Sequence, residues 1–152
     1  MKNDLFFMKR AYEQALLGFN KEEIPVGAVV VYENEIISEA HNNSISKTDP
    51  TSHAEIEAIR DAALKIGNYR LTDAAMYVTL EPCLMCCGAL IHARFDKVIF
   101  STKDQKSGAV ISNGNLLEAD FINHLVKFKQ GPLQEESSAL LKEFFKNKRS
   151  KA

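Results

Sequence analysis

The chain has 152 residues, of which 45% are hydrophobic and 26% are charged, values typical of one compact domain with an apolar core. This composition excludes whole-chain disorder, collagen and coiled coil, and no apolar run approaches the roughly 20 residues that span a bilayer. The first ten residues, MKNDLFFMKR, lack the apolar segment and cleavage site of a secretory signal. We therefore expect a single domain over residues 1–152, located in the cytoplasm.

The net charge is −1, but the charge is distributed unevenly along the sequence. Residues 142–152 contain five basic side chains and one acidic side chain, a local charge of +4, so the remaining 141 residues carry −5. A cationic tail on an acidic body suggests a polyanionic partner, although a lysine-rich final helix is more often a solvated face. Charge alone leaves both interpretations open.

The first half of the chain predicts a helix, a hairpin and a second helix. Residues 4–19 place apolar side chains on one face at helical spacing, namely Leu5, Met8, Tyr12, Ala15 and Phe19. Two β-rich runs at 24–32 and 36–40 flank a short polar segment, which predicts a hairpin. Ser52 and Glu55 fit a capping box, so the second helix should begin at or near His53 and end at Gly67.

The second half predicts a βαβ unit and a closing helix. Residues 75–80 and 97–101 form two apolar runs that should be parallel strands, joined by a helix over 82–93 with Pro82 in its first turn. Residues 102–117 resemble a surface loop, 125–128 a fifth strand, and about 134–149 a basic C-terminal helix. The expected fold class is therefore α/β, a single-domain three-layer α/β/α architecture with a mixed five-stranded sheet.

Three cysteines lie within five positions, Cys83, Cys86 and Cys87. An odd number of clustered thiols without a secretory signal indicates metal or redox chemistry rather than disulfides. Cys83 and Cys86 share a helix face near its N-terminus, where the dipole stabilises thiolates. The pair alone fits either zinc or a thioredoxin-like dithiol. Cys87 points about 100° around the helix from Cys86, so we assign it to packing.

His53 and Glu55 each have an ordinary explanation when taken alone, a first-turn histidine and a capping-box glutamate. If both helix starts meet at one sheet edge, His53, Cys83 and Cys86 supply three ligands to a zinc ion and leave the fourth position for water. Zinc with two thiolates and a neutral imidazole has no net charge, and it can activate water near neutral pH when a base takes the proton. We hypothesise that Glu55 is this base.

The motifs His53-Ala54-Glu55 and Pro82-Cys83-Leu84-Met85-Cys86 resemble the signature of the zinc-dependent cytidine deaminase superfamily. Residues 24–28, 49–56, 68–71 and 77–83 resemble its branch that acts on adenosine in bacterial tRNA, and the likeness extends from the first helix to Phe144-Phe145. The resemblance implies a cytidine deaminase-like fold and hydrolytic deamination of adenosine to inosine at the wobble position of a tRNA anticodon loop. It also implies a homodimer with one zinc ion per subunit, in which Glu55 shuttles protons.

The same resemblance implies the residues that bind the substrate. Val26 would line the base pocket, Asn42 would hydrogen-bond the base, and the Ala54 N–H would help to place its edge. Asp104, in the loop 103–109, would contact neighbouring nucleotides. The last helix would offer aromatic and basic side chains to the anticodon stem-loop, namely Phe144, Phe145, Lys146 and Arg149. We expect at least one of the two phenylalanines to anchor the core. The chain departs from the family pattern at Ser52, Cys87 and Ser101.

Two other functions remain open. A deaminase of free guanine or cytosine would share the zinc ligands and the fold, and a non-catalytic zinc-stabilised RNA-binding protein would share the ligands alone. The aromatic and basic residues near the C-terminus favour the tRNA substrate over a free base. Glu55 and the open fourth ligand position argue for turnover.

Overall fold

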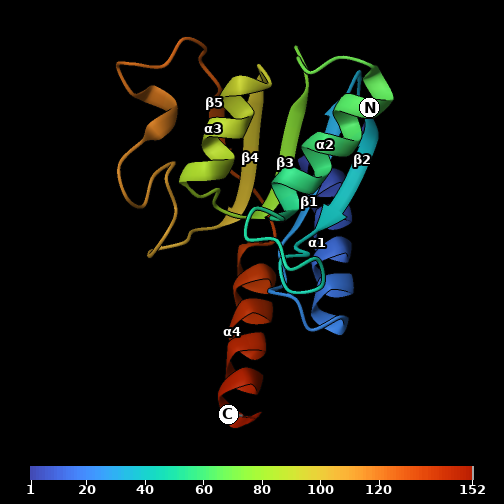
Figure 1. The fold of residues 1–152 in the computed structure, drawn as a ribbon, viewed down its shortest axis with the longest axis vertical. Helices are drawn as coiled ribbons and strands as arrows, with labels where there is room; N and C mark the ends of the chain where they lie inside the picture. Colours follow the sequence, from blue (N-terminus) through green and yellow to red (C-terminus); the bar gives the residue numbers. More distant parts are fainter. Residues whose placement is uncertain (152) are drawn as a thin grey trace.

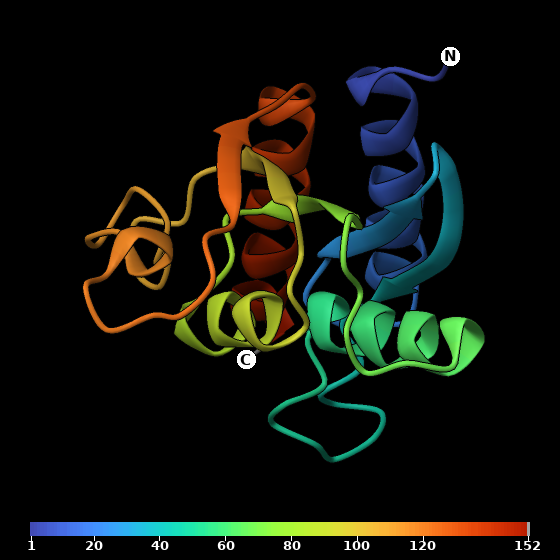
Figure 2. The ribbon, with the colours of Figure 1, turned by 90° about the horizontal axis from the view of Figure 1, so that it is seen from above.

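A mixed five-stranded sheet carries helices on both faces in the computed structural model, which describes residues 1–151. The strand order is β2-β1-β3-β4-β5, in which β1 is antiparallel to β2 and β3, whereas β4 and β5 run parallel to β3. Helices α1 and α4 cover one face and α2 and α3 the other (Figures 1 and 2). The predicted three-layer α/β/α architecture is confirmed. The elements are α1 (Asp4–Asn20), β1 (Gly27–Tyr32), β2 (Glu35–His41), α2 (Ala54–Ile66), β3 (Ala75–Leu80), α3 (Leu84–His92), β4 (Lys97–Thr102), β5 (Lys127–Gln130) and α4 (Gln134–Lys151), with a short 3-10 turn at Leu116–Glu118.

Alternation along the strands divides the core between the two faces of the sheet. Val29 and Val31 of β1 pack with α1, whereas Ala28 and Val30 pack beneath α2 and α3. Successive strand side chains point to opposite faces, so a nearly unbroken apolar strand such as β1 supplies both cores. The hairpin that joins β1 to β2 turns through Glu33 and Asn34, both at positive φ, as a two-residue type I′ turn requires.

Small residues let α1 lie close to the sheet. A Cβ at Gly27, the first residue of β1, would lie 1.9 Å from the Ala11 carbonyl oxygen in α1, so only glycine fits there. The buried face of α1 consists of Phe7, Met8, Ala11, Ala15 and Gly18. This differs from the predicted face, because Leu5 is exposed while Tyr12 and Phe19 are only partly buried.

The second helix begins next to His53 as predicted, but its capping box and the predicted start of the third helix are corrected by the structure. In α2 the N-cap is His53, which makes no capping hydrogen bond, and the Ser52 hydroxyl donates to Glu57 instead of forming a capping box with Glu55. In α3 the N-cap is Cys83, so Pro82 precedes the helix rather than lying in its first turn. Gly67 ends α2 at φ 76°, as predicted.

The carboxyl ends of β3 and β4 lie at one edge of the sheet, the usual position of a site in an open α/β fold. The chain passes from β3 directly into the Cys83 N-cap of α3, and the start of β1 and the end of β2 pair at the same edge through Gly27 and His41. The N-terminus of α2 also lies there, since the Ala54 N–H bonds to Asn42, which follows β2. Within residues 1–151, no helix combines the length and apolar character that a bilayer crossing requires.

Candidate metal centre and pocket

The starts of α2 and α3 bring three ligand groups to one point. The Nδ1 atom of His53 lies 3.6 Å from the Sγ of Cys83 and 3.6 Å from the Sγ of Cys86. All three ligand atoms lie within 4.8 Å of one another, and no fourth His, Cys, Asp or Glu joins them among the described residues. The spatial coincidence predicted from the two motifs is therefore present.

These separations match a tetrahedral zinc site. Zinc–sulfur bonds of about 2.3 Å and zinc–nitrogen bonds of about 2.0 Å, set at tetrahedral angles, place sulfur and nitrogen about 3.5 Å apart. Both observed nitrogen–sulfur distances are 3.6 Å. Three protein ligands leave one coordination position for water, the arrangement of catalytic rather than structural zinc.

The two sulfurs differ in their protonation. Hydrogen bonds from the Cys86 thiol and from His53 and the Cys86 backbone N–H hold the pKa of Cys83 at about 4. The neighbouring Cys83 thiolate, together with burial, raises the pKa of Cys86. One thiolate is thus preformed at the helix N-terminus, while the second proton leaves when a dication binds, because metal binding displaces protons from thiols.

Glu55 is the second residue of α2 and lies in the same pocket as His53 and Cys83. Its side chain is buried, and this burial raises the pKa of Glu55 to about 7. A carboxyl group that titrates near neutrality is suited to take and return protons. Glu55 is not one of the three clustered ligands, so its carboxylate remains available for that role.

Cys87 lies apart from the metal centre. It is fully buried in the core beneath α2 and α3, and its thiol donates to the Pro82 carbonyl at 3.8 Å. Burial raises the pKa of Cys87 to about 12, which keeps it a neutral thiol. Its predicted assignment to packing agrees with this position.

A pocket of about 720 Å³ opens over the metal centre. Its floor contains Val26, Asn42, His53, Glu55 and Cys83, all singled out from the sequence. Its rim carries four basic side chains, Lys103, Lys106, Lys142 and Arg149, which we call the basic rim. A pocket of this size accommodates a nucleobase with its sugar, and the rim provides positive charge where phosphates would lie.

The floor of the pocket contains one hydrogen bond that changes a predicted role. The Ala54 N–H donates to Oδ1 of Asn42 at 2.7 Å. In this arrangement the Ala54 amide orients Asn42 rather than a substrate, and the Asn42 amide group is left to face the pocket. Val26 is buried at 4% exposure and lines the pocket from the residue before β1.

One wall of the pocket is the loop that follows β4. Residues 103–107 line it, and Oδ1 of Asp104 accepts hydrogen bonds from the backbone N–H groups of Lys106 and Ser107. Asp104 therefore shapes its own loop in this structure while it also borders the pocket.

The opposite wall is one stripe of α4, made of Ser138, Leu141, Lys142, Phe145 and Arg149. Phe145 is 43% exposed and reaches the pocket, whereas Phe144 is buried against Phe19 of α1, with ring centroids 6.3 Å apart. Phe144 is therefore corrected from a substrate contact to a core anchor, because its ring is enclosed between the two helices. Lys146 is exposed but does not line the pocket.

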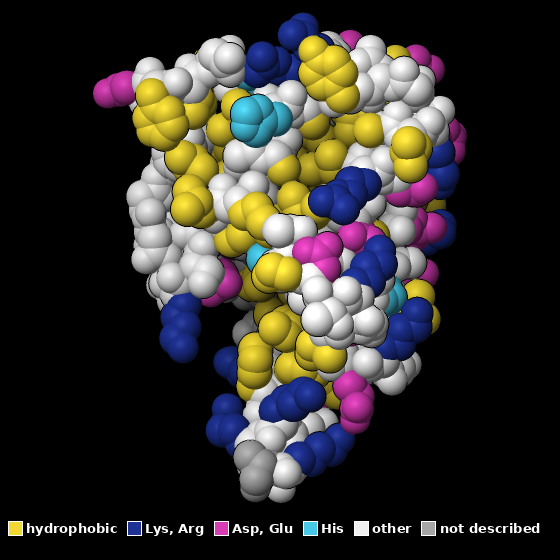
Figure 3. All heavy atoms as spheres, viewed as in Figure 1, with side chains coloured by type: hydrophobic (Ala, Val, Ile, Leu, Met, Phe, Trp, Pro, Cys, Tyr) yellow, Lys and Arg dark blue, Asp and Glu magenta, His cyan; other side chains and the backbone are white. Residues whose placement is uncertain are grey.

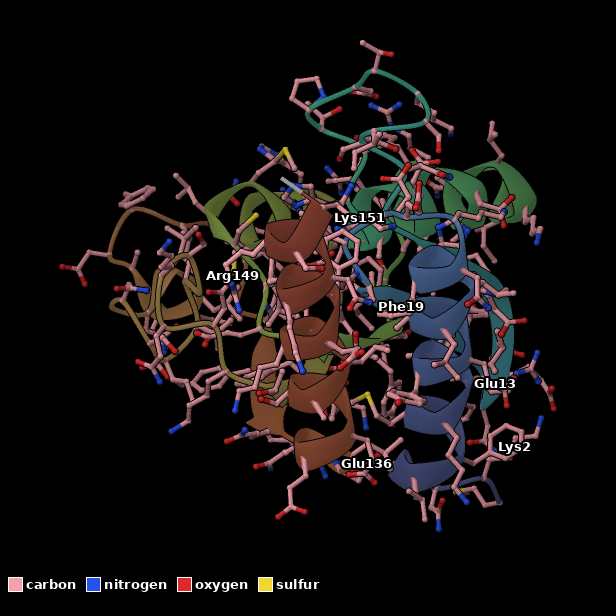
Figure 4. All side chains as sticks on the ribbon, turned by 90° about the horizontal axis from the view of Figure 1, so that it is seen from below. Lys2, Glu13, Phe19, Glu136, Arg149 and Lys151 are labelled. Atoms are coloured by element: carbon pink, nitrogen blue, oxygen red, sulfur yellow. The ribbon has the colours of Figure 1, made fainter. Side chains whose placement is uncertain are left out.

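The figures agree with the assignment of one side of α4 to the pocket and another to packing against α1. On the face shown in Figure 3, lysine and arginine side chains gather along the C-terminal part of α4. Phe19 lies between α1 and α4, while Arg149 lies on the side of α4 away from α1 (Figure 4).

Sequence reasoning missed several pocket residues. Ile24, Leu80 and Thr102 line the pocket because they lie where β1, β3 and β4 begin or end at the same sheet edge. Glu81, which lies within the family-like segment 77–83 but was assigned no role from the sequence, also lines the pocket. An acidic residue between an apolar strand and the Pro82-Cys83 pair was the signal that the sequence offered.

Comparison with known proteins agrees with this geometry. A family model described as "Cytidine and deoxycytidylate deaminase zinc-binding region" matches residues 1–102. A tRNA-specific adenosine deaminase of Aquifex aeolicus is 48% identical over 95% of each chain.

Two solved structures differ in how well they fit this chain. One, from structural studies of A-to-I editing by tRNA:A34 deaminases at the wobble position, has a TM-score of 0.87 at 34% identity and covers 90% of this chain and 99% of that one. A guanine deaminase of Bacillus subtilis is 33% identical, with a TM-score of 0.66 over 96% and 95% of the two chains. At nearly equal identity, the tRNA deaminase has the more similar backbone.

Proposed function

This chain belongs to the cytidine and deoxycytidylate deaminase family and, within it, to the tRNA-specific adenosine deaminases, and we propose that it hydrolyses adenosine to inosine at the wobble position of a tRNA anticodon loop. The observation that carries this function is a three-ligand zinc site beside a buried glutamate, at the bottom of a pocket with a basic rim. Zinc is the cofactor, held by His53, Cys83 and Cys86, and we propose one ion per subunit.

The reaction replaces the 6-amino group of adenine by oxygen from water and releases ammonia. Zinc bound by the three ligands supplies the Lewis acidity that makes a water molecule nucleophilic near neutral pH. Glu55 accepts the proton of that water and delivers protons to the ring nitrogen and to the departing amine. Burial raises the pKa of Glu55, which favours a carboxyl group that both takes up and returns protons.

The pocket supports an extruded base. Asn42 faces the base while its Oδ1 is fixed by the Ala54 N–H at 2.7 Å, and Val26 gives the base an apolar wall. Base-modifying enzymes flip their target out of its stack, and the basic rim together with the half-exposed ring of Phe145 provides phosphate contacts and a stacking surface for the neighbouring nucleotides. We propose that Asp104 contacts those nucleotides from the loop side.

The experiment that tests this function offers purified protein an anticodon stem-loop with adenosine at the wobble position, free adenosine, free guanine and free cytosine. We expect inosine in the stem-loop and negligible turnover of the free compounds. Deamination of guanine or cytosine with the stem-loop unchanged would contradict the proposal and favour a free-base deaminase. Binding of the stem-loop without turnover by the zinc-loaded protein would favour a non-catalytic RNA-binding protein.

We propose that the chain acts as one deaminase domain in a homodimer, in the cytoplasm where tRNA is found. The face that carries α2 and α3 exposes large apolar side chains (Figure 3), among them Leu64 at 83%, Tyr69 at 72% and Leu84 at 69% exposure. A patch of this kind is typical of a protein interface. Light scattering should give twice the chain mass, and a monomer at micromolar concentration would contradict the dimer.

A further inference from the structure

The carboxylate of Glu81 binds both ends of the loop that follows β4, whose residues 103–107 line the pocket. Oε2 accepts hydrogen bonds from the backbone N–H groups of Val110, Ile111 and Ser112, at 3.1, 2.8 and 2.9 Å. Oε1 accepts from the Asp104 N–H at 3.1 Å and from the Ser112 hydroxyl. All five donors belong to the segment 104–112, and Glu81 itself is only 1% exposed.

The loop 103–112 has almost no regular secondary structure that would stabilise its conformation. Within 103–112 the chain forms turns, and its one ladder contact is an isolated bridge between Cys83 and Gly108. The Ala109 N–H also donates to the Pro82 carbonyl at 2.9 Å. Residues 81–83, directly after β3, therefore bind the loop that lines the pocket, and one of them, Cys83, is also a metal ligand.

The contact between Glu81 and the loop leaves no spare room. A Cβ at Gly108 would lie 2.3 Å from the Glu81 carboxyl carbon, so the loop backbone closes directly over the carboxylate. A carboxylate accepts several hydrogen bonds and donates none, whereas a glutamine would turn an NH2 group towards N–H donors. Five converging donors thus require the acid and not merely a side chain of its shape.

We propose that Glu81 is a positioning residue that sets the RNA-binding conformation of the loop 103–112, and through it the KM for the anticodon stem-loop. The proposal rests on the proposed function, because it names what holds the substrate wall of that same site. Glu81 acts through the backbone of Asp104 and of residues 110–112, which flank the pocket-lining residues 103–107, while the chemistry stays with Glu55 and the metal ligands.

The chain offers a matched control in Glu23, which is also 1% exposed. Its carboxylate accepts hydrogen bonds from the Ile45 and Ser46 N–H groups and from the Ser46 hydroxyl. It therefore holds a second loop by the same means, but residues 43–50 contribute nothing to the pocket. Glu23→Gln reproduces the loss of a buried loop-binding carboxylate without touching the substrate wall.

The test compares Glu81→Gln, Glu81→Asp and Glu23→Gln in the zinc-loaded protein. Glu81→Gln should raise the KM for the stem-loop by about tenfold or more, keep kcat within about threefold, keep the zinc content of the wild type, and accelerate amide hydrogen exchange at Val110, Ile111 and Ser112. Glu81→Asp, which retains the charge, should recover part of the KM. Glu23→Gln should accelerate exchange at Ile45 and Ser46 and leave the KM unchanged.

A second variant keeps the test decisive if Glu81→Gln does not fold. Ser112→Ala removes one hydroxyl donor from the carboxylate and should raise the KM in the same direction by a smaller factor. Faster loop exchange with an unchanged KM would overturn the proposal, and so would a loss of zinc and kcat at constant KM. If the wild type leaves the stem-loop unmodified, the proposed function fails. If it is active and only the KM effect is missing, this inference fails alone.

Discussion

Phe144 and Phe145 are adjacent in sequence, but substitution of Phe144 should lower the stability of the protein, whereas substitution of Phe145 should weaken RNA binding. Phe144 is 6% exposed and its ring packs edge-on against Phe19 at 6.3 Å, whereas Phe145 is 43% exposed and lines the pocket. Truncation of a buried phenylalanine to alanine costs about 3–5 kcal/mol, so Phe144→Ala should lower the free energy of unfolding by that amount. Phe145→Ala removes a ring that is about half buried and should cost about 1 kcal/mol.

Leucine substitutions separate packing from RNA binding at the same two positions. Phe144→Leu keeps most of the apolar volume between α4 and α1, so stem-loop binding should stay close to that of the wild type. Phe145→Leu loses the aromatic face on which a base can stack, worth about 1–3 kcal/mol, and should weaken binding by about 5- to 150-fold. Phe145→Tyr keeps that face and should bind nearly as well as the wild type.

Urea unfolding and fluorescence titration of a labelled stem-loop measure the two quantities. The reasoning is refuted if Phe145→Ala destabilises the protein more than Phe144→Ala does. It is equally refuted if Phe144→Leu and Phe145→Leu weaken RNA binding to the same extent, since one ring is enclosed and the other borders the pocket.

Three further outcomes follow from the metal centre and the basic rim. Glu55→Gln should keep the zinc content and lower kcat by about 10²- to 10⁴-fold, as measured by metal analysis and single-turnover deamination; full activity would exclude Glu55 as the proton shuttle. His53→Ala removes one of three ligands and should lose zinc on dialysis against a mild chelator, whereas wild-type zinc retention would show that the ion binds elsewhere. If all four side chains of the basic rim contact phosphates, affinity for the stem-loop should fall about 50-fold between roughly 50 and roughly 200 mM salt. Lys127→Ala, at the opposite end of the sheet, should leave that salt dependence unchanged, and a flat salt response would argue against phosphate contacts.

The sequence predicted β3 residue for residue, because a short run rich in apolar and β-forming residues, between Asp73 and the Glu81-Pro82 pair, is typical of a buried strand. The three metal ligands could also be predicted, since each lies in a short motif at the start of a helix: His53 at the start of α2, and Cys83 and Cys86 at the start of α3. The buried face of α1 was predicted only in part: Met8 and Ala15 are buried as expected, but close packing on β1 also uses Ala11 and Gly18, where a hydrophobic pattern looks for large side chains.

The remaining features depend on contacts between distant segments. Glu81 acquires its role from a loop that begins more than 20 residues later, and the Ala54 amide is bonded by Asn42, 12 residues earlier. Neither partner can be chosen from local spacing. Which of Phe144 and Phe145 is buried depends on how α4 rotates against α1, and both faces of that helix contain apolar residues.

The stripe of α4 that borders the pocket repeats at intervals of three and four residues, while the buried Ser137 and Phe144 lie on another side of the same helix. Substrate preference could therefore be changed by randomising the stripe positions of this single helix. The buried side of the helix and the groups around the metal ion would stay unchanged. By the same geometry, inserting one residue into the connection before α4 would rotate the helix by about 100°, which would carry the buried side towards the pocket and turn the stripe away from it, so insertions at this point should be far more damaging than substitutions along the stripe.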